Sequence, residues 1–316
     1  MFSIKKLTTN SRSIALIVDE KEKKVKETIY FTELTRDMDE KIIKSNNFTK
    51  DMSQYTIISK NNEFKLKKEY LFQMTCNNNP QDSFPREIKL IIAPSNSGKS
   101  YQLANYIIRY NQAFQKNLIA YASTHSIKAD KSFKPVFEKE IDIKEIDVNA
   151  MDSIIDFSEK DAHNSLFIFD DMDTNTGIVR LEDMDIDSSQ LTPLQKTKAI
   201  KTAKLKSLDN DYFVNESVKN LIHNARKYRV SMAYIFHDFF NGRFENELLT
   251  ETTSVILFPY NSDNTQLTKW LLQKLKMNKE QVKFINDITW FQYDFLEINK
   301  FGGKRFLLTP DTLKLF

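Results

Sequence analysis

The feature that most constrains this chain is the stretch LIIAPSNSGKSYQL at residues 90–103, where an apolar run passes through small polar residues into a helical pattern. Residues 87–92 have the composition of a short buried strand, and apolar side chains recur at helical spacing from Tyr101 to Ile108. The turn between them holds Gly98, although the chain has only 5 glycines in 316 residues. The stretch therefore predicts a strand, a tight loop and a helix in direct succession.

The loop has the spacing of the phosphate-binding loop, or Walker A motif, in which backbone N–H groups surround the phosphates of a nucleotide. Gly98 lets the backbone approach the phosphates, Lys99 reaches the β- and γ-phosphates, and the Ser100 hydroxyl takes a place on Mg²⁺. The following helix adds the positive end of its dipole. Ala93 occupies the first position, where we expect a negative φ. The predicted nucleotide-binding residues are Pro94, Ser95, Asn96, Ser97, Gly98, Lys99, Ser100 and Tyr101.

A second apolar strand, SLFIFD at residues 165–170, ends at Asp170 and is followed by Asp171. This is the Walker B pattern, in which Asp170 holds Mg²⁺ and Asp171 orients or deprotonates the attacking water. Two acids at the strand end favour hydrolysis over simple binding, so ATP and Mg²⁺ are the predicted ligands. The NKEQ sequence at 278–281 does not fit the NKxD motif of switch GTPases, and an LSGGQ-like signature is lacking.

A third polar position follows the strand that ends in AYIF, where His237 and Asp238 come next. In ring ATPases a polar residue at such a position contacts the γ-phosphate or the attacking water. His237 is therefore the candidate sensor, and the alternative is a histidine that only caps a strand end. None of the four histidines forms a metal-binding pair with Cys76 at a recognisable spacing, so no zinc site is predicted.

The order of elements predicts the fold class. From residue 86 onward, strands alternate with helices, which indicates an α/β P-loop NTPase with a mainly parallel sheet and helices on both faces. The predicted strands are 87–92, 117–122, 165–170, 230–236 and 253–258, and the predicted helices are 99–115 and 213–228. Before them, residues 13–19 and 27–31 predict a hairpin, and 55–59 and 70–74 predict further short strands, within a small β-rich N-terminal segment. We therefore expect an N-terminal segment at 1–80 and an ATPase domain at 81–316, with an insertion around 172–212. Two further core elements are predicted, a helix at 264–276 and a strand at 290–295.

Composition excludes several classes. The 46 basic and 43 acidic residues leave a net charge of +3, so any nucleic-acid surface must be a local patch. The single Cys76 excludes an intramolecular disulfide and suits a reducing compartment. Residues 1–10 contain no apolar segment fit for a signal peptide, and no run approaches the length of a membrane span. We expect an intracellular protein that is not secreted.

The motifs also follow a recognisable order. APSNSGKS, LFIFDD, NARKYRVS at 224–231, MAYIFHD and SVILFPYN resemble, in sequence, the virion DNA-packaging ATPases of poxviruses and other large or intermediate eukaryotic DNA viruses. These belong to the FtsK/HerA superfamily, and the resemblance covers about residues 86–300. Arg226 matches the family arginine, and His237 stands where the family has glutamine. Ala225 and Lys227 depart from the family glycine and histidine.

The resemblance implies a homo-oligomeric ring, pentameric or hexameric, with ATP sites between neighbours and double-stranded DNA in the channel. It also implies that an arginine of one subunit stabilises the transition state in the next. Arg226 is the first candidate, with Arg180 and Arg229 behind it. A basic segment at 192–208 could project into the channel and hold DNA phosphates, or could equally be a solvated surface helix. Its lysines are Lys196, Lys198, Lys201, Lys204 and Lys206.

The leading hypothesis from the sequence is an ATP-driven double-stranded DNA translocase that packages a viral genome into a capsid. The expected location is the cytoplasm of an infected cell, at the site of virus assembly, and the virion. The expected partners are capsid-vertex or inner-membrane virion proteins. The alternatives are a helicase or other nucleic-acid-dependent P-loop ATPase, and a nucleotide-dependent interaction module that does not hydrolyse. A small-molecule kinase would need an acceptor pocket and an arginine lid, for which the sequence has no clear signal.

Overall fold

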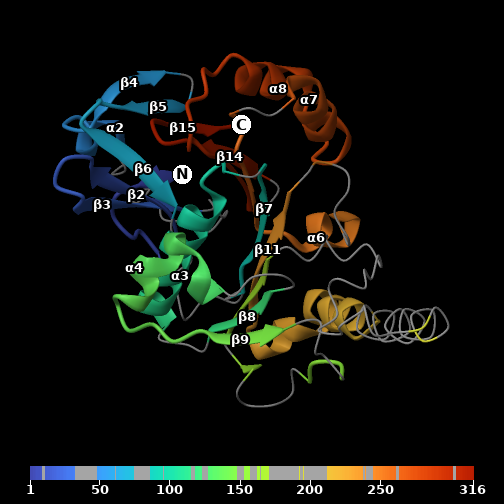
Figure 1. Cartoon of the computed structure of the whole chain (residues 1–316). Coiled ribbons are helices and arrows are strands. Elements are labelled where there is room, and N and C mark those ends of the chain that lie inside the picture. Colours follow the sequence, from blue (N-terminus) through green and yellow to red (C-terminus); the bar gives the residue numbers. More distant parts are fainter. Residues whose placement is uncertain are drawn as a thin grey trace.

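The computed structural model in Figure 1 describes most of the chain. The described residues are 1–8, 11–32, 48–60, 62–74, 86–94, 96–114, 118–122, 127–147, 153–156, 162–163, 165–170, 192, 195, 212–237, 239, 245–260, 263–301 and 304–316. The lysines of the predicted basic segment and the candidate Arg180 lie outside them. None of the helices within these ranges is long and apolar enough to cross a membrane.

A large mixed sheet organises the structure, and one half of it is parallel. Within the described residues this sheet has 11 strands. The parallel half runs, in spatial order, through β12 (Ser254–Leu257), β7 (Ile88–Ile92), β11 (Ser231–Phe236), β10 (Leu166–Asp170), β8 (Leu118–Ala122) and β9 (Lys144–Asp147). The sequence predicted all of these strands except β9. β7, which precedes the loop, therefore lies between β11 and β12.

The other half of the sheet is antiparallel, and of its strands the sequence predicted only the one at 55–59. β13 (Leu296–Phe301) pairs with β12, and β14 (Lys304–Leu308), β15 (Thr312–Leu315), β5 (Glu63–Leu66) and β4 (Thr56–Lys60) follow. The prediction of a strand at 290–295 is wrong. These residues precede β13 as a turn, in which Phe291 is 67% exposed and Tyr293 is 57% exposed. Phe295, at the end of the turn, is buried.

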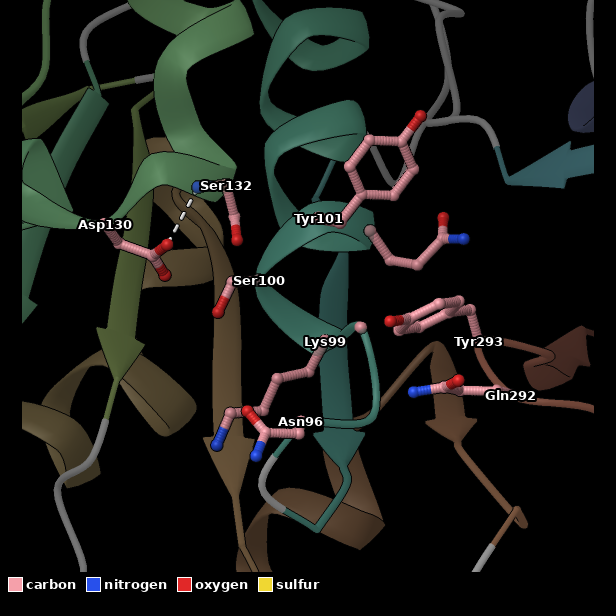
Figure 2. A pocket seen from close by; sticks show the side chains of 10 residues that line it. Asn96, Lys99, Ser100, Tyr101, Asp130, Ser132, Gln292 and Tyr293 are labelled. Atoms are coloured by element: carbon pink, nitrogen blue, oxygen red, sulfur yellow. Dashed lines mark hydrogen bonds between the residues drawn. The ribbon is translucent and has the colours of Figure 1, made fainter.

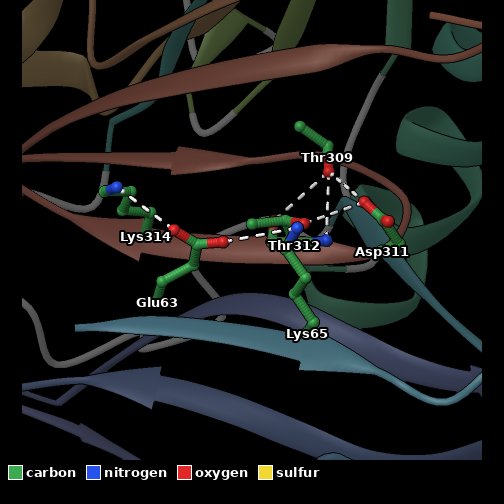
Figure 3. Close-up of polar contacts among 6 residues, drawn as sticks. All are labelled: Glu63, Lys65, Thr309, Asp311, Thr312 and Lys314. Atoms are coloured by element: carbon green, nitrogen blue, oxygen red, sulfur yellow. Dashed lines mark hydrogen bonds and ion pairs between the residues drawn. The ribbon is translucent and has the colours of Figure 1, made fainter. Parts of the chain in front are cut away.

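N-terminal strands are joined to this antiparallel half. Figure 3 shows Lys314 of β15 reaching Glu63 of β5, with Nζ 3.1 Å from Oε2. The turn before β15 is held by Asp311, whose carboxylate accepts hydrogen bonds from the hydroxyls of Thr309 and Thr312, both at 2.9 Å. The N- and C-terminal parts of the chain thus meet in one sheet.

The smaller sheet lies beside this junction (Figure 1). It contains β1 (Phe2–Ser3), β3 (Val25–Phe31), β2 (Arg12–Asp19) and β6 (Tyr70–Met74), all antiparallel, and the β2–β3 pair confirms the predicted hairpin. An aromatic cluster fills the space between the two sheets, with ring centroids 4.7 to 6.1 Å apart. It consists of Phe2, Phe31, Phe48, Phe64 and Phe306, where Phe48 begins the short helix α2 (Phe48–Asp51).

Helices cover both faces of the parallel half, as the sequence predicted. Successive residues of β7 alternate between the faces: Leu90 belongs to one buried cluster and Ile91 to the other. α3 (Lys99–Phe114) and α4 (Lys134–Phe137) pack on the Ile91 face. The opposite face is covered by the helix over residues 212–224 and by α6 (Glu245–Glu251), α7 (Asn264–Gln273) and α8 (Lys279–Asn286).

Local capping explains the C-terminal helices. Asp263 accepts hydrogen bonds from the backbone N–H groups of Thr265 and Gln266, which fixes the start of α7. The NKEQ sequence that fails as a base-reading motif has a structural role instead. Asn278 and Gln281 form a reciprocal capping box at the start of α8.

A buried ion pair joins the parallel and antiparallel halves. Lys89 of β7 lies 2.8 Å from Glu297 of β13, and the two side chains are only 3% and 1% exposed. The Lys89 ammonium also donates to the Ser254 hydroxyl of the intervening strand β12, at 3.1 Å. Because both charges are out of water, their mutual attraction and this hydrogen bond must offset a large desolvation cost.

Candidate nucleotide-binding site

The loop after β7 has the backbone that the sequence motif requires. Ala93 donates its N–H to the carbonyl of Phe236, at 3.0 Å, so the start of the loop is tied to the end of β11. Asn96 and Gly98 adopt positive φ angles of 60° and 95°, whereas Ala93 does not, as expected. α3 begins at Lys99. Ser95 lies outside the described residues.

Donors converge where the loop enters α3. The first bond of this helix runs from the Gln102 N–H to the Gly98 carbonyl, at 3.1 Å. The N–H groups of the preceding residues have no acceptor one turn back in the helix, which makes a helix start an anion-binding site. The Ser97 hydroxyl is buried and has no hydrogen-bond partner among the described residues. An oxygen-rich anion bound in the loop would supply the missing acceptors.

Lys99 and His237 meet directly. The Lys99 ammonium lies 2.8 Å from Nδ1 and 2.9 Å from Nε2 of the His237 ring, at the end of β11. An ammonium group can only donate, so one ring nitrogen must be unprotonated to accept. Two residues separated by more than a hundred positions in the sequence are thus brought together at one edge of the sheet.

β10 delivers the acidic residue to the same edge. Asp170 ends this strand, which pairs in parallel with β11, and β11 pairs with β7. Neighbouring strands are spaced by about 4.8 Å, so the end of β10 lies about 10 Å from the end of β7. The Asp170 side chain and Asp171 lie outside the described part of the structure.

A pocket of about 870 Å³ opens at this edge, as Figure 2 shows. Among the predicted nucleotide-binding residues, Pro94 and Ser97 are not in its lining. Five further lining residues, Gln102, Asp130, Ser132, Gln292 and Tyr293, were not predicted. Asp130 accepts a hydrogen bond from the Ser132 N–H at 2.8 Å, which orders the segment after β8. The lining residues are Asn96, Gly98, Lys99, Ser100, Tyr101, Gln102, Asp130, Ser132, Gln292 and Tyr293.

Two of the predicted trans-acting arginines, Arg226 and Arg229, lie at the opposite edge of the sheet. The backbone of Arg226 belongs to the 3₁₀ helix Ala225–Tyr228, and exposed Arg229 lies two residues before β11 begins. β11 has 6 residues. At about 3.3 Å per residue this strand separates the two edges by about 20 Å. The structure therefore does not bring Arg226 or Arg229 to the loop of their own chain.

Arg86 fixes the segment that carries these arginines. This buried side chain donates from Nη2 to the carbonyls of Leu221 and Ile222, at 3.0 and 2.9 Å. These carbonyls belong to the last turns of the helix over residues 212–224, where carbonyls lack helical partners. Tyr228 then stacks on His163, with ring centroids 4.8 Å apart. The end of this helix, which leads into the basic turn, is thus tied to Arg86, two residues before β7 begins.

The residues present fit a nucleotide. The orphan hydroxyl of Ser97, the helix start at Lys99 and the Ser100 hydroxyl in the pocket lining form a set of donors suited to phosphates. No group of three His, Cys, Asp or Glu side chains able to hold a metal occurs within the described residues, which leave out the Asp170 side chain and Asp171. Ser100 and the end of β10 are the places from which Mg²⁺ would be held.

Comparisons with known proteins define no family for this chain. No protein-family model matches it, and no curated protein sequence does either. Among solved structures it is similar to the genome packaging NTPase B204 from Sulfolobus turreted icosahedral virus 2. The complex with ATP-gammaS is 14% identical, the match covers 72% of this chain and 98% of that chain, and the TM-score is 0.40. The complex with sulfate is also 14% identical, with 72% of this chain and 97% of that chain covered and a TM-score of 0.44.

The pCW3 conjugation coupling protein TcpA, in a monomer form with ATPgS, is 10% identical over 96% of this chain and 77% of that chain, with a TM-score of 0.36. TM-scores this low do not establish a shared activity.

Proposed function

We propose that this protein is an ATP-hydrolysing, double-stranded DNA translocase that packages a viral genome into a capsid. The observation that carries the ATPase part is the meeting of Lys99 with His237 at the loop, two strands from the point where Asp170 ends β10. The order of sequence motifs, which resembles that of virion packaging ATPases, supports the DNA part. Its expected place is the virus assembly site of an infected cell.

Each residue has a defined task in this proposal. The loop N–H groups and the Ser97 hydroxyl bind phosphate oxygens, and Lys99 leaves His237 to pair with the β- and γ-phosphates. That exchange leaves the unprotonated ring nitrogen of His237 free to accept a hydrogen bond from the attacking water, while the protonated ring nitrogen can donate to the γ-phosphate. Asp171 orients or deprotonates that water. Ser100 and Asp170 would hold Mg²⁺, whose positive charge would then lie close to the phosphate oxygens.

The position of Arg226 favours an assembly of several subunits. An arginine about 20 Å from the loop of its own chain can reach the γ-phosphate only in a neighbouring subunit. A homo-oligomeric ring, pentameric or hexameric, would supply that neighbour at every site. Double-stranded DNA would pass through the channel, with Lys196, Lys198, Lys201, Lys204 and Lys206 as candidate phosphate contacts. Capsid-vertex or inner-membrane virion proteins would anchor the ring.

The first experiment is steady-state ATP hydrolysis across protein concentration, with and without linear duplex DNA. We expect turnover that rises steeply with protein concentration, is stimulated by duplex DNA and is lost in Asp171→Asn. The neighbouring exchange Lys227→Ala is the matched control for Arg226→Ala, because both remove one positive charge from the same turn. Of these two variants, Arg226→Ala should abolish hydrolysis and Lys227→Ala should retain it.

Mixing two inactive variants tests whether the arginine acts between subunits. In a mixed ring, an Asp171→Asn subunit still offers Arg226 to an Arg226→Ala neighbour, whose own Asp171 is intact. Such interfaces should recover activity in proportion to their statistical frequency. Absence of recovery in stable mixed rings would contradict the trans arrangement. ATP binding without turnover under all conditions would instead favour the non-hydrolysing interaction module.

A further inference from the structure

The turn that precedes β13 is built in an unusual way. The Asp294 N–H donates to the Phe291 carbonyl at 3.1 Å, and the Asp294 carboxylate accepts from the Phe291 N–H at 2.9 Å. Gln292 and Tyr293 form the corner between them. Tyr293 has a φ of 73°, a value typical of the third position of a type II turn, where glycine or asparagine is usual. Burial raises the pKa of Asp294, and the hydrogen bond from Phe291 acts against it.

A tyrosine in this conformation is held against the phosphate-binding loop. A Cβ atom on Gly98 would lie 2.9 Å from Cδ1 of Tyr293, so the ring packs directly on the glycine. More than half of the Tyr293 side chain remains accessible, and both Tyr293 and Gln292 line the pocket. Residues kept in disfavoured backbone conformations by the surrounding structure cluster at ligand-binding sites. The Tyr293 ring thus forms an aromatic wall beside the loop, and this residue belongs to neither Walker motif.

The pocket is chemically divided. Figure 2 shows Tyr101, Gln292 and Tyr293 on one side of the first turn of α3, and Ser100, Ser132 and Asp130 on the other. Sheet order agrees with this division. The turn with Tyr293 leads into β13 beyond β12, whereas His237 and the end of β10 lie on the opposite side of β7. A triphosphate held in the loop with its γ-phosphate toward Lys99 and His237 therefore has its nucleoside on the aromatic side.

We propose that Tyr293 and Gln292 bind the nucleoside of the nucleotide and set the preference for adenine. The Tyr293 ring packs against the base, and the Gln292 amide offers one donor and one acceptor, the pair that matches the N6 and N7 edge of adenine. This inference rests on the proposed nucleotide-binding function. It adds a base-recognition site formed by a segment remote in sequence from both Walker motifs.

The test compares equilibrium binding of ATP, GTP and inorganic tripolyphosphate, which has no nucleoside. Tyr293→Gly is the sharpest variant, because glycine removes the ring and also accepts a φ of 73° without strain. We expect it to weaken ATP binding by about 10- to 100-fold, the range typical of lost base stacking. Tripolyphosphate binding should stay unchanged, and the thermal unfolding midpoint should be at least that of the wild type. Tyr293→Phe should retain ATP affinity, and Gln292→Ala should reduce the preference for ATP over GTP.

Phe291→Ala is the matched control, since Phe291 belongs to the same turn and is exposed but does not line the pocket. It should leave all three affinities unchanged. The proposal is overturned if Tyr293→Gly weakens ATP and tripolyphosphate equally, which would make the ring a support for the loop, or if it weakens neither. Failure of the underlying function would look different: the wild type would bind neither ligand, or Lys99→Ala would leave both affinities intact.

Discussion

Replacing Gly98 by alanine tests two features of the loop at one position, the positive φ angle of Gly98 and the close approach of Tyr293. The φ of 95° is unfavourable for any residue with a Cβ, at a cost of about 1–2 kcal/mol. The new methyl group would also meet Tyr293, with Cδ1 at 2.9 Å and Cβ at 3.5 Å. Because Tyr293 is 57% exposed, its ring can turn away, so we expect this contact to add only about 0.5–1 kcal/mol.

A double-mutant cycle separates the two costs. Urea unfolding of the wild type, Gly98→Ala, Tyr293→Gly and the double variant gives four free energies of unfolding. Gly98→Ala should cost about 1.5–3 kcal/mol in the wild type and about 1–2 kcal/mol once the ring is gone. Equal costs in both backgrounds would show that the ring does not pack on the loop. No cost in either background would refute the left-handed conformation of Gly98.

Three further predictions concern the interior and the sensor position. Glu297→Gln removes the counter-ion of buried Lys89 and should lower the free energy of unfolding by about 3–5 kcal/mol. The double change Lys89→Met with Glu297→Leu should be near neutral. Equal losses of stability for the single and the double variant in urea unfolding would show that Lys89 and Glu297 do not form a buried ion pair. Burial lowers the pKa of Lys300 to about 8 from its ordinary 10.5. Between pH 8 and 10.5 the Lys300 side chain is protonated in the unfolded chain only, so the free energy of unfolding of the wild type should rise with pH relative to that of Lys300→Met. The expected rise is about 1–2 kcal/mol, allowing for screening. Free energies of unfolding that change in parallel with pH for the two proteins would contradict this. His237→Gln keeps an acceptor and should retain most hydrolysis, while His237→Leu should lose it, and a fully active leucine variant would remove His237 from the site.

The parts of the site that follow from local pattern were predictable. The apolar run of β7, the glycine and the helical spacing of α3 are adjacent in sequence, so one short stretch specified the loop. Asp170 and His237 were likewise predicted to follow strand ends. That these ends meet depends on sheet order, in which β11 lies between β7 and β10. Strand order is decided by packing between distant segments, which local periodicity does not encode.

The packing of Tyr293 on the phosphate-binding loop was not predicted, because the sequence around Tyr293 has the pattern of a strand. Aromatic residues recur through WFQYDF at 290–295, and such a pattern is typical of β-structure. The segment forms a turn instead, because the Asp294 carboxylate accepts a hydrogen bond from the Phe291 N–H. An aspartate inside an aromatic run was the available signal. The pairing of β5 with β15 could not be predicted, because some 250 residues separate Glu63 from its partner Lys314.

Movement along duplex DNA is the central claim, and it can be measured directly. A short third strand bound to a linear duplex is displaced by a protein that translocates along the double helix, without separation of the two duplex strands. We expect displacement of the third strand that requires ATP hydrolysis, is absent in Lys99→Ala and leaves the duplex intact. ATP hydrolysis without displacement of the third strand would contradict translocation, and release of single strands would identify a helicase instead.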